Sequence, residues 1–245
     1  MKNLVEVKNI KKNYGSKNAV KDVSFCIKEN EILGLLGPNG SGKTTTIGMM
    51  LGLLKPSGGE ILIADKKIEK SRIEILQQIN FISPYIELPK KLTVEQNLIV
   101  YGKLYNVKNI KRRIEYLTDK LRLSELLNRL TGELSSGQRN RVSLAKALIN
   151  DPIVLLLDEP TASLDPEIGD YVRTFLEDYK KEKKISILLA SHNMNEVTRL
   201  CKSILMMKEG VIIDKGSPEQ LIKKHGRQNL EEVFLKLSRS KDEFN

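Results

Sequence analysis

The stretch Gly37-Pro38-Asn39-Gly40-Ser41-Gly42-Lys43-Thr44 matches the pattern G-x-x-x-x-G-K-[ST]. Its glycines let the backbone curl so that several N–H groups point inward, toward phosphate oxygens. The stretch follows a short apolar run, Ile32–Leu36, that is typical of a buried strand, and it precedes a predicted helix over Thr44–Leu54. We therefore expect a phosphate-binding loop rather than a chance glycine-rich turn. In such a loop Lys43 reaches the β- and γ-phosphates and Thr44 places its hydroxyl on Mg²⁺.

Two adjacent carboxylates follow a second apolar run. Ile153–Leu157 has five apolar residues in a row, as in a strand covered on both faces, and Asp158 and Glu159 come directly after it. Asp158 is placed to hold Mg²⁺, and Glu159 to orient or deprotonate an attacking water. An acidic turn after a core strand is the structural alternative. The two patterns together indicate a nucleoside triphosphate that is hydrolysed or transferred, but they do not separate a kinase from a molecular motor.

Outward from these motifs, strands and helices alternate. The pattern predicts early strands, a helical middle and a return to alternation, which favours an α/β core with a mostly parallel sheet and the site at the carboxyl ends of its strands. The predicted strands are Leu4–Val7, Val20–Ile27, Ile61–Ala64, Ile185–Ala190 and the hairpin Ile204–Met207 with Val211–Asp214. The predicted helices are Val94–Tyr105, about Ile110 to Leu130, Ser135 to about Asn150, Asp165 to about Lys183, one capped by Asn193, a short one from Ser217 to Gly226, and an amphipathic tail helix with Leu230, Val233, Phe234 and Leu237 on one face.

Composition excludes several classes of protein. The 245 residues are 40% hydrophobic and 29% charged, as in a soluble globular protein. The longest apolar run, Ile47–Leu54, is far below the roughly twenty residues of a membrane helix, and Met1–Lys12 lacks a signal-peptide core. Two cysteines support neither a disulfide framework nor a structural zinc site, which fits a reducing compartment. The net charge of +10 suits either polyanion binding or a solvated lysine-rich surface, and 5% aromatics argue against a base-stacking groove.

A third motif, Leu134-Ser135-Ser136-Gly137-Gln138, resolves the choice left open above. Ser135 caps a helix whose free N–H groups, with Gly137, can bind a phosphate. One chain already has a phosphate loop, so a second phosphate-binding helix end is useful if it serves the nucleotide of another subunit. With the two earlier motifs, this stretch resembles the signature of ATP-binding cassette (ABC) ATPases, and the resemblance runs from about Leu4 to Leu237.

The resemblance implies a fold and a division of the chain. The fold is a P-loop NTPase (RecA-like) core with an antiparallel β subdomain and an inserted α-helical subdomain. The core takes about 1–84 and 151–224, the helical subdomain about 85–150, and a short tail 225–245. The resemblance also implies that two such domains pack head to tail, with ATP between one phosphate loop and the signature of the partner.

The same resemblance implies the site. Glu159, His192 and Lys43 act in catalysis, with His192 contacting the γ-phosphate and holding Glu159 and the water. Thr44 and Asp158 hold Mg²⁺. The ATP-binding set is Tyr14, which stacks on adenine, with Gly37, Pro38, Asn39, Gly40, Ser41, Gly42, Lys43, Thr44, Thr45, Ser135, Ser136, Gly137 and Gln138. Ser163-Leu164-Asp165 resembles the D-loop at the dimer interface, and Asp165 is also a predicted helix N-cap.

Two positions depart from the family pattern. Pro84 stands where the family usually has a glutamine, sometimes a glutamate, that touches Mg²⁺. Proline has no side-chain oxygen, so we hypothesise that water or the Ser83 hydroxyl fills that metal position and that hydrolysis or coupling is altered. Ser136 stands where glycine is usual, with little expected consequence. We expect the remaining histidine, His225, to be solvated.

The resemblance implies partners and a role. They are a second copy of the chain and separate integral-membrane subunits, met by the surface at Tyr85, Ile86, Glu87 and Leu88; nucleic acid is not an expected partner. The tail Leu230–Leu237 resembles the end of drug- and lipid-type exporter ATPases. The expected function is an ATP-hydrolysing subunit that powers export from the cytoplasmic face of a membrane. The alternative is an ABC ATPase without transport, acting as a membrane regulator or on ribosomes or nucleic acid; a P-loop kinase does not explain Leu134–Gln138.

Overall fold

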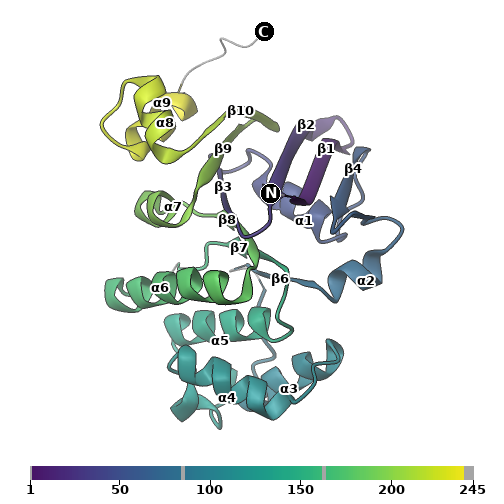
Figure 1. The fold of residues 1–245 in the computed structure, drawn as a ribbon, viewed down its shortest axis with the longest axis vertical. Coiled ribbons are helices and arrows are strands. Elements are labelled where there is room, and N and C mark those ends of the chain that lie inside the picture. Colours follow the sequence, from purple (N-terminus) through teal and green to yellow (C-terminus); the bar gives the residue numbers. More distant parts are fainter. Residues whose placement is uncertain (1, 84–85, 162–163, 240–245) are drawn as a thin grey trace. The chain divides into compact units, whose positions relative to one another are not determined.

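The computed structural model describes residues 2–83, 86–161 and 164–239. The chain divides into two compact units: unit 1 comprises Met1–Ile75 and Ser186–Asn245, and unit 2 comprises Leu76–Ile185. The short helix α2 (Arg72–Leu76) spans the boundary between them in the sequence. Figure 1 shows the elements.

Unit 1 is built on a mixed sheet in the order β5-β4-β1-β2-β10-β9-β3-β8. Its strands are β1 (Asn3–Tyr14), β2 (Lys17–Lys28), β3 (Ile32–Leu36), β4 (Gly58–Ile63), β5 (Lys66–Lys67), β8 (Ser186–Ala190), β9 (Ser203–Lys208) and β10 (Val211–Gly216). Its helices are α1 (Lys43–Met50), α7 (Met194–Leu200), α8 (Pro218–His225) and α9 (Leu230–Arg239).

The pattern of apolar residues explains which strands run parallel. All residues of β3 and β8 are buried, and β3 pairs in parallel with both β8 and β9, as expected for strands covered on both faces. In β1 and β2, by contrast, buried residues alternate with more exposed ones, and the two strands pair antiparallel. Val5 lies opposite Ile27, and Ile10 lies opposite Val23. The α/β core and the antiparallel β region predicted from the sequence are therefore confirmed.

The caps predicted in unit 1 are present. The Asn193 side chain accepts from Glu196 N at the start of α7, and Ser217 forms a capping box with Gln220 at the start of α8. Gly226, whose φ is 61°, caps the carboxyl end of α8. Leu230 and Val233 are buried on one face of α9, as its amphipathic pattern predicts.

The expectation that His225 is solvated is wrong. Its side chain is only 14% exposed, and Nε2 lies 2.6 Å from Asp214 Oδ2. Asp214, on β10, is also bound by Lys224 Nζ at 2.7 Å and by Lys215 N at 2.8 Å. Burial opposes ionisation of Asp214, but these hydrogen bonds outweigh it and lower the pKa of the carboxyl. The Lys-Lys-His run at the end of α8 therefore binds this carboxylate.

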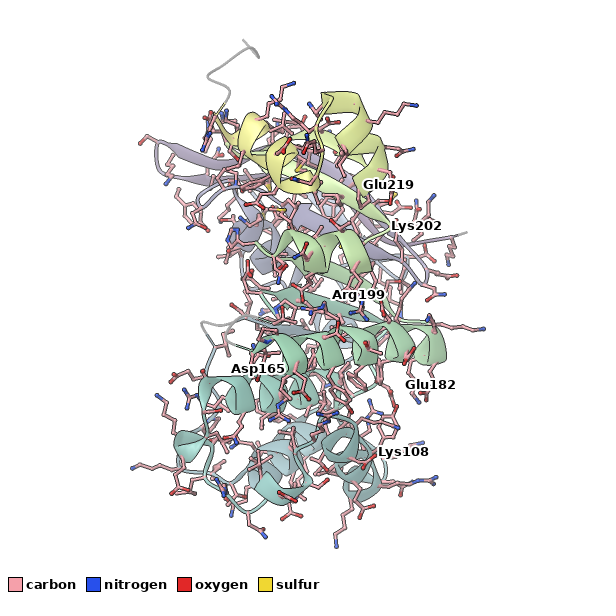
Figure 2. The ribbon with its side chains drawn as sticks, turned by 90° about the vertical axis from the view of Figure 1, so that its left-hand side faces the viewer. Lys108, Asp165, Glu182, Arg199, Lys202 and Glu219 are labelled. Carbon is pink, nitrogen blue, oxygen red and sulfur yellow. The ribbon has the colours of Figure 1, made fainter. Side chains whose placement is uncertain are left out.

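Unit 2 combines a pair of parallel strands with helices. The strands are β6 (Ile79–Ile82) and β7 (Val154–Asp158), and the helices are α3 (Val94–Leu104), α4 (Ile110–Lys120), α5 (Ser136–Leu148) and α6 (Pro166–Lys183), with 3₁₀ turns η1 (Ser124–Leu126) and η2 (Thr131–Glu133). Both predicted capping boxes, Thr93 with Gln96 and Ser135 with Gln138, form as expected. Asp165 caps α6, with Pro166 in its first turn, and lies at the amino end of that helix in Figure 2.

Some segments differ from the prediction. The helix expected from about Ile110 to Leu130 ends at Lys120, because Arg122 adopts a left-handed backbone with φ of 52°. Strand β6 was not predicted, since Asn80 interrupts its apolar run; Asn80 is nevertheless buried, and its Nδ2 donates to Asn150 Oδ1 at 3.0 Å. Within the described ranges, none of the helices combines the length and apolar character needed to cross a bilayer.

Candidate nucleotide-binding site

In unit 1 the phosphate loop connects the end of β3 to the start of α1. Gly42 is the N-cap of α1 with φ of 106°, a conformation that favours glycine. A Cβ on Gly37 would lie 2.2 Å from the carbonyl oxygen of Met207, so only glycine fits there. The strand–loop–helix context that the motif requires is therefore present.

The side chains of the loop divide into buried and exposed groups. Lys43 is 9% exposed, and its Nζ donates to the carbonyl oxygens of Gly37 at 2.6 Å and Pro38 at 3.2 Å. Asn39, Gly40 and Thr44 are exposed. The buried Ser41 hydroxyl has no hydrogen-bond partner among the described residues. Such a buried polar group calls for an explanation, and a polar ligand in the loop supplies one.

Two further candidate residues lie in unit 1. Tyr14 ends β1 and is 46% exposed, and Lys12 Nζ lies 5.2 Å from the centroid of its ring. His192 follows β8 and is exposed. The turn that carries His192 is held by Ser191, whose Oγ donates to Glu196 Oε2 at 2.5 Å and accepts from Asn193 N at 3.1 Å. The histidine is thus presented at the carboxyl end of a parallel strand.

In unit 2 the two candidate carboxylates end β7. Asp158 is 8% exposed, and Ser83 Oγ lies 3.5 Å from its Oδ2. Glu159 has a left-handed backbone with φ of 53°, which non-glycine residues rarely adopt. Carboxylate and hydroxyl oxygens suit Mg²⁺, so Asp158 with Ser83 fits the donor chemistry of such a site. Because Glu159 leaves the extended conformation of β7, the side chains of Asp158 and Glu159 do not point to opposite faces as they would in a continued strand.

The stretch Leu134–Gln138 forms the amino end of α5 in unit 2. Ser135 Oγ accepts from Gln138 N at 3.2 Å, and Gln138 Oε1 accepts from Ser135 N at 2.9 Å. Leu134 is buried, whereas Ser135 and Ser136 are exposed. The helix end is therefore fixed by its own capping box and presents its first residues outward, as a phosphate-binding helix end must.

These two sets of residues match a known family. The sequence profile of the ABC transporter family matches residues 20–162. The chain belongs to the ABC transporter family. It is 38% identical over 220 residues to the ABC transporter ATP-binding protein NatA of Bacillus subtilis (strain 168), a match that covers 89% of each chain.

Other ABC relatives agree. The Nod factor export ATP-binding protein I of Burkholderia orbicola (strain AU 1054) is 36% identical over 220 residues, which is 89% of this chain and 72% of that protein. Among solved structures, a dimeric ATP-binding cassette in a post-hydrolysis state, bound to ADP and Pi, superposes with a TM-score of 0.81 at 27% identity, covering 87% of this chain and 98% of the other. The chain is thus an ATP-binding ABC subunit with the fold of an ABC ATPase, and homologous cassettes hydrolyse ATP.

Part of the ABC pattern lies outside the described residues. Pro84, at the position of the usual glutamine, falls there, as do Tyr85 at the expected membrane-partner surface and Ser163 of the expected D-loop. Among the described residues, unit 1 holds Tyr14, Gly37–Thr45 and His192, and unit 2 holds Ser135–Gln138, Asp158 and Glu159.

Three residues beside the ABC motifs have contacts that the sequence did not indicate, although Glu196 is expected there as a capping residue of its helix. Met207 packs against the phosphate loop, Glu196 holds the turn before His192, and Lys146 lies buried on the signature helix α5. Lys146 Nζ donates to the carbonyl oxygen of Phe81, and burial lowers the pKa of Lys146 to about 8. A lysine within the apolar run Leu144–Leu148 is the one signal that could have identified it.

Proposed function

We propose that this chain binds Mg-ATP between its own phosphate loop and the signature helix end of a second copy, and that hydrolysis of this ATP powers export through separate membrane subunits. The observation that supports this most is the outward-facing corner at Ser135 and Ser136, on a chain that already has a complete phosphate loop at Gly37–Thr44. A dimeric relative with ADP and Pi favours the shared arrangement.

Each site residue has a chemical role in this proposal. The loop N–H groups and Lys43 bind the β- and γ-phosphates, while the Tyr14 ring stacks on adenine. Thr44 and Asp158 hold Mg²⁺, and bound Mg²⁺ neutralises charge on the phosphates. Glu159 accepts a proton from the attacking water as its oxygen bonds to the γ-phosphorus and the bond to ADP breaks. His192, presented at the end of β8, contacts the γ-phosphate.

Separate membrane subunits are the second expected partner. Ile86 is 43% exposed in the segment that we expected to meet them, and Glu87 is exposed, whereas Leu88 is buried. On the same unit, Val100 and Leu104 of α3 are 43% and 63% exposed. Exposed apolar side chains of this kind suit a protein partner. We place the chain on the cytoplasmic face of the membrane, where it reaches ATP.

Export is the proposed direction, because a relative is named for Nod factor export and because α9 resembles the end of exporter ATPases. An ABC ATPase that regulates a membrane protein or acts on ribosomes or nucleic acid is the alternative. Pull-down from detergent-solubilised membranes separates the two: recovery of a multi-span protein supports the proposal, and recovery of ribosomes or DNA instead would contradict it.

The variant Glu159→Gln tests the catalytic part of the proposal. Without the carboxylate base, ATP hydrolysis should fall about 100-fold or more, while ATP binding persists and traps a dimer. Glu167→Gln is the matched control, because the Glu167 side chain is 85% exposed on α6. Light scattering at saturating ATP measures the mass. A Glu159→Gln protein that binds ATP but remains monomeric would overturn the shared site.

A further inference from the structure

The C-terminal helix α9 and the start of the phosphate loop border the same small space in unit 1. Phe234 and Leu237 of α9 line it together with Gly37 and Pro38; Met206, Met207, Lys208, Ile213 and Ser238 complete its wall. The space has a volume of about 10 Å³. That is barely the room needed by one water molecule, so α9 closes against this end of the loop with little intervening solvent.

Met207, the penultimate residue of β9, lines this space and contacts the phosphate loop. A Cβ on Gly37 would lie 2.2 Å from the Met207 carbonyl oxygen, and a Cβ on Gly42 would lie 2.8 Å from the Met207 methyl carbon. Met207 therefore touches both glycine-bearing ends of the phosphate loop. Met207 also lines the space that Phe234 and Leu237 line.

We propose that Phe234 and Leu237, acting through Met207, are positioning residues for nucleotide binding, so that docking of α9 holds Gly37 and Gly42 in the conformation that accepts phosphate. This inference rests on the proposed role of Gly37–Thr44 in binding ATP. It adds Phe234 and Leu237, which lie almost 200 positions after the loop in the sequence, to the residues that affect ATP binding.

The chemistry of Met207 makes this transmission effective. Methionine has three rotatable bonds and fills irregular gaps, so its position depends on what packs beside it. If the Phe234 ring is removed, the Met207 side chain can move into the vacated space and leave Gly42, which its methyl carbon contacts, less constrained. Gly37 would lose part of the wall that it shares with α9. A loop that is in its binding conformation only part of the time binds its ligand more weakly in proportion to that fraction.

The contacts of Lys43 lead to the same pair of residues. Its Nζ donates to the carbonyl oxygens of Gly37 and Pro38, the two loop residues that border the α9 space. To bind a phosphate, Lys43 must exchange these oxygens for phosphate oxygens. The packing of α9 then supports Gly37 and Pro38 while their bonds to the lysine are lost.

Helix α9 can respond to nucleotide because its stability depends on packing. It has only 10 residues, which is too short for a stable isolated helix, and its buried residues are Leu230 and Val233. Coupling between two sites is reciprocal. If docked α9 favours nucleotide binding, then bound nucleotide must favour docked α9.

The experiment compares three variants by calorimetric titration with Mg-ADP, which binds without being hydrolysed. Phe234→Ala should raise the Kd for ADP about tenfold, as expected if about one tenth of the loops remain in the binding conformation. Phe234→Leu should restore binding to within about threefold of wild type, because leucine refills most of the space. Leu235→Ala is the matched control, since Leu235 lies on the same helix and is 38% exposed; its Kd should be unchanged.

A second measurement uses the unaltered chain and does not depend on how well any variant folds. Saturating ADP should slow hydrogen exchange of the α9 amides at 233–238, and Lys43→Ala should abolish this effect. Unchanged α9 exchange in wild type at saturating ADP, or an unchanged Kd in Phe234→Ala, would overturn the coupling while leaving ATP binding itself intact. Failure of the wild-type chain to bind ADP would instead overturn the proposed function, and the coupling with it.

Discussion

The ammonium of Lys146 lies 3.1 Å from the carbonyl oxygen of Phe81, which joins the signature helix α5 to the end of β6. The ring centroids of Phe81 and Tyr101 lie 5.1 Å and 5.4 Å from the same nitrogen. The aromatic faces and one carbonyl thus take the place of water around a cation that is only 7% exposed. Ser83, which neighbours Asp158, follows Phe81 by two residues, so this contact connects the signature helix to the proposed metal site.

The buried charge of Lys146 should make stability depend on pH. Burial lowers its pKa in the folded chain from 10.5 to about 8, so between these values the unfolded chain binds the extra proton and stability rises with pH. Relative to Lys146→Met, wild type should gain about 2 kcal/mol of unfolding free energy between pH 8 and pH 10, measured by urea denaturation. Lys108→Met is the control, because Lys108 is exposed (Figure 2). If the difference in unfolding free energy between wild type and Lys146→Met did not change between pH 8 and pH 10, the prediction would be contradicted.

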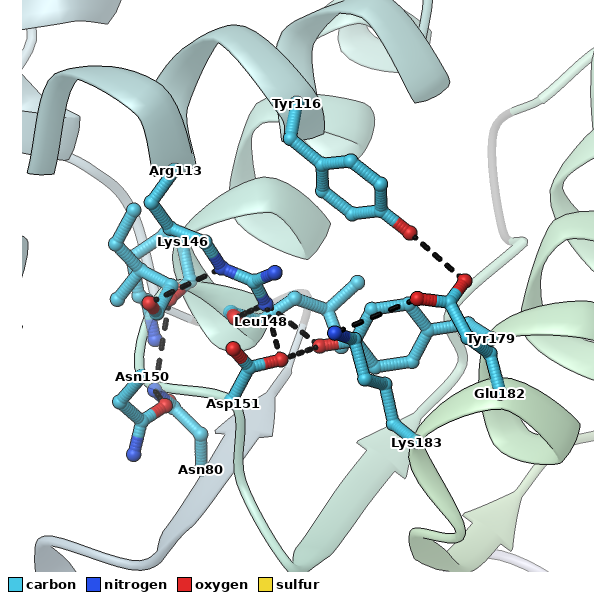
Figure 3. Close-up of polar contacts among 11 residues, drawn as sticks. Asn80, Arg113, Tyr116, Lys146, Leu148, Asn150, Asp151, Tyr179, Glu182 and Lys183 are labelled. Atoms are coloured by element: carbon cyan, nitrogen blue, oxygen red, sulfur yellow. Dashed lines mark hydrogen bonds and ion pairs between the residues drawn. The ribbon is translucent and has the colours of Figure 1, made fainter. Parts of the chain in front are cut away.

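Of the two arginines of α4, Arg113 should contribute more to the stability of the fold. Its Nη2 donates to the carbonyl oxygen of Leu148 and to Tyr179 Oη at 2.6 Å, and lies 2.9 Å from Asp151 Oδ1 (Figure 3). These contacts join α4, the end of α5, α6 and the residue before Pro152. The Arg113 side chain is 10% exposed, but that of Asp151 is 50% exposed. We therefore expect Arg113→Met to lower the free energy of unfolding by about 2 kcal/mol, less than the loss of one partner of a fully buried ion pair would.

The neighbouring Arg112 supplies the comparison for that measurement. It is exposed on the same helix, so Arg112→Met should change the free energy of unfolding by less than about 0.5 kcal/mol. Arg113→Lys should recover only part of the loss, since lysine cannot reproduce the planar fork of the guanidinium. Equal stability of the Arg112 and Arg113 variants in urea denaturation would show that the network contributes nothing.

Two glycines of the phosphate loop should respond differently to alanine. A Cβ on Gly37 would lie 2.2 Å from a backbone oxygen, whereas a Cβ on Gly40 would have no atom within 4 Å. Alanine at position 40 would therefore be opposed only by the backbone strain of a φ of 81°. That strain costs about 1–2 kcal/mol, so Gly40→Ala should weaken ATP binding about thirtyfold at most. Gly37→Ala should weaken it well beyond that, as measured by calorimetry. Equal losses would show that the clash with Met207 is relieved by movement of β9.

Local signals in the sequence predict most of the elements that carry the site. The glycines of Gly37–Thr44, the apolar run before Asp158, and the capping boxes at Thr93 and Ser135 each depend on residues within a few positions of one another. The structure confirms these elements because backbone conformation and capping act over one turn of chain.

Contacts between distant segments were not predictable from one sequence. Nothing near Met207 indicates that it packs on Gly37, 170 positions earlier, because that contact exists only after β3 and β9 pair in parallel. His225 was misjudged for the same reason, since its partner Asp214 lies on another element. Pattern analysis reports the face of an element but not which side chain it will meet.

Ser83 offers a direct test of the proposed metal site. Its hydroxyl oxygen lies 3.5 Å from Asp158 Oδ2, which is longer than a good O–H···O hydrogen bond. At this separation both oxygens could bind one cation or one bridging water. We therefore expect Ser83→Ala to raise the Mg²⁺ concentration needed for half-maximal ATPase activity about three- to tenfold, as loss of one ligand costs on the order of 1 kcal/mol. Ser83→Thr keeps the hydroxyl and should behave like wild type. If Ser83→Ala shows the wild-type Mg²⁺ dependence, water alone fills the position that Pro84 leaves without a side-chain oxygen.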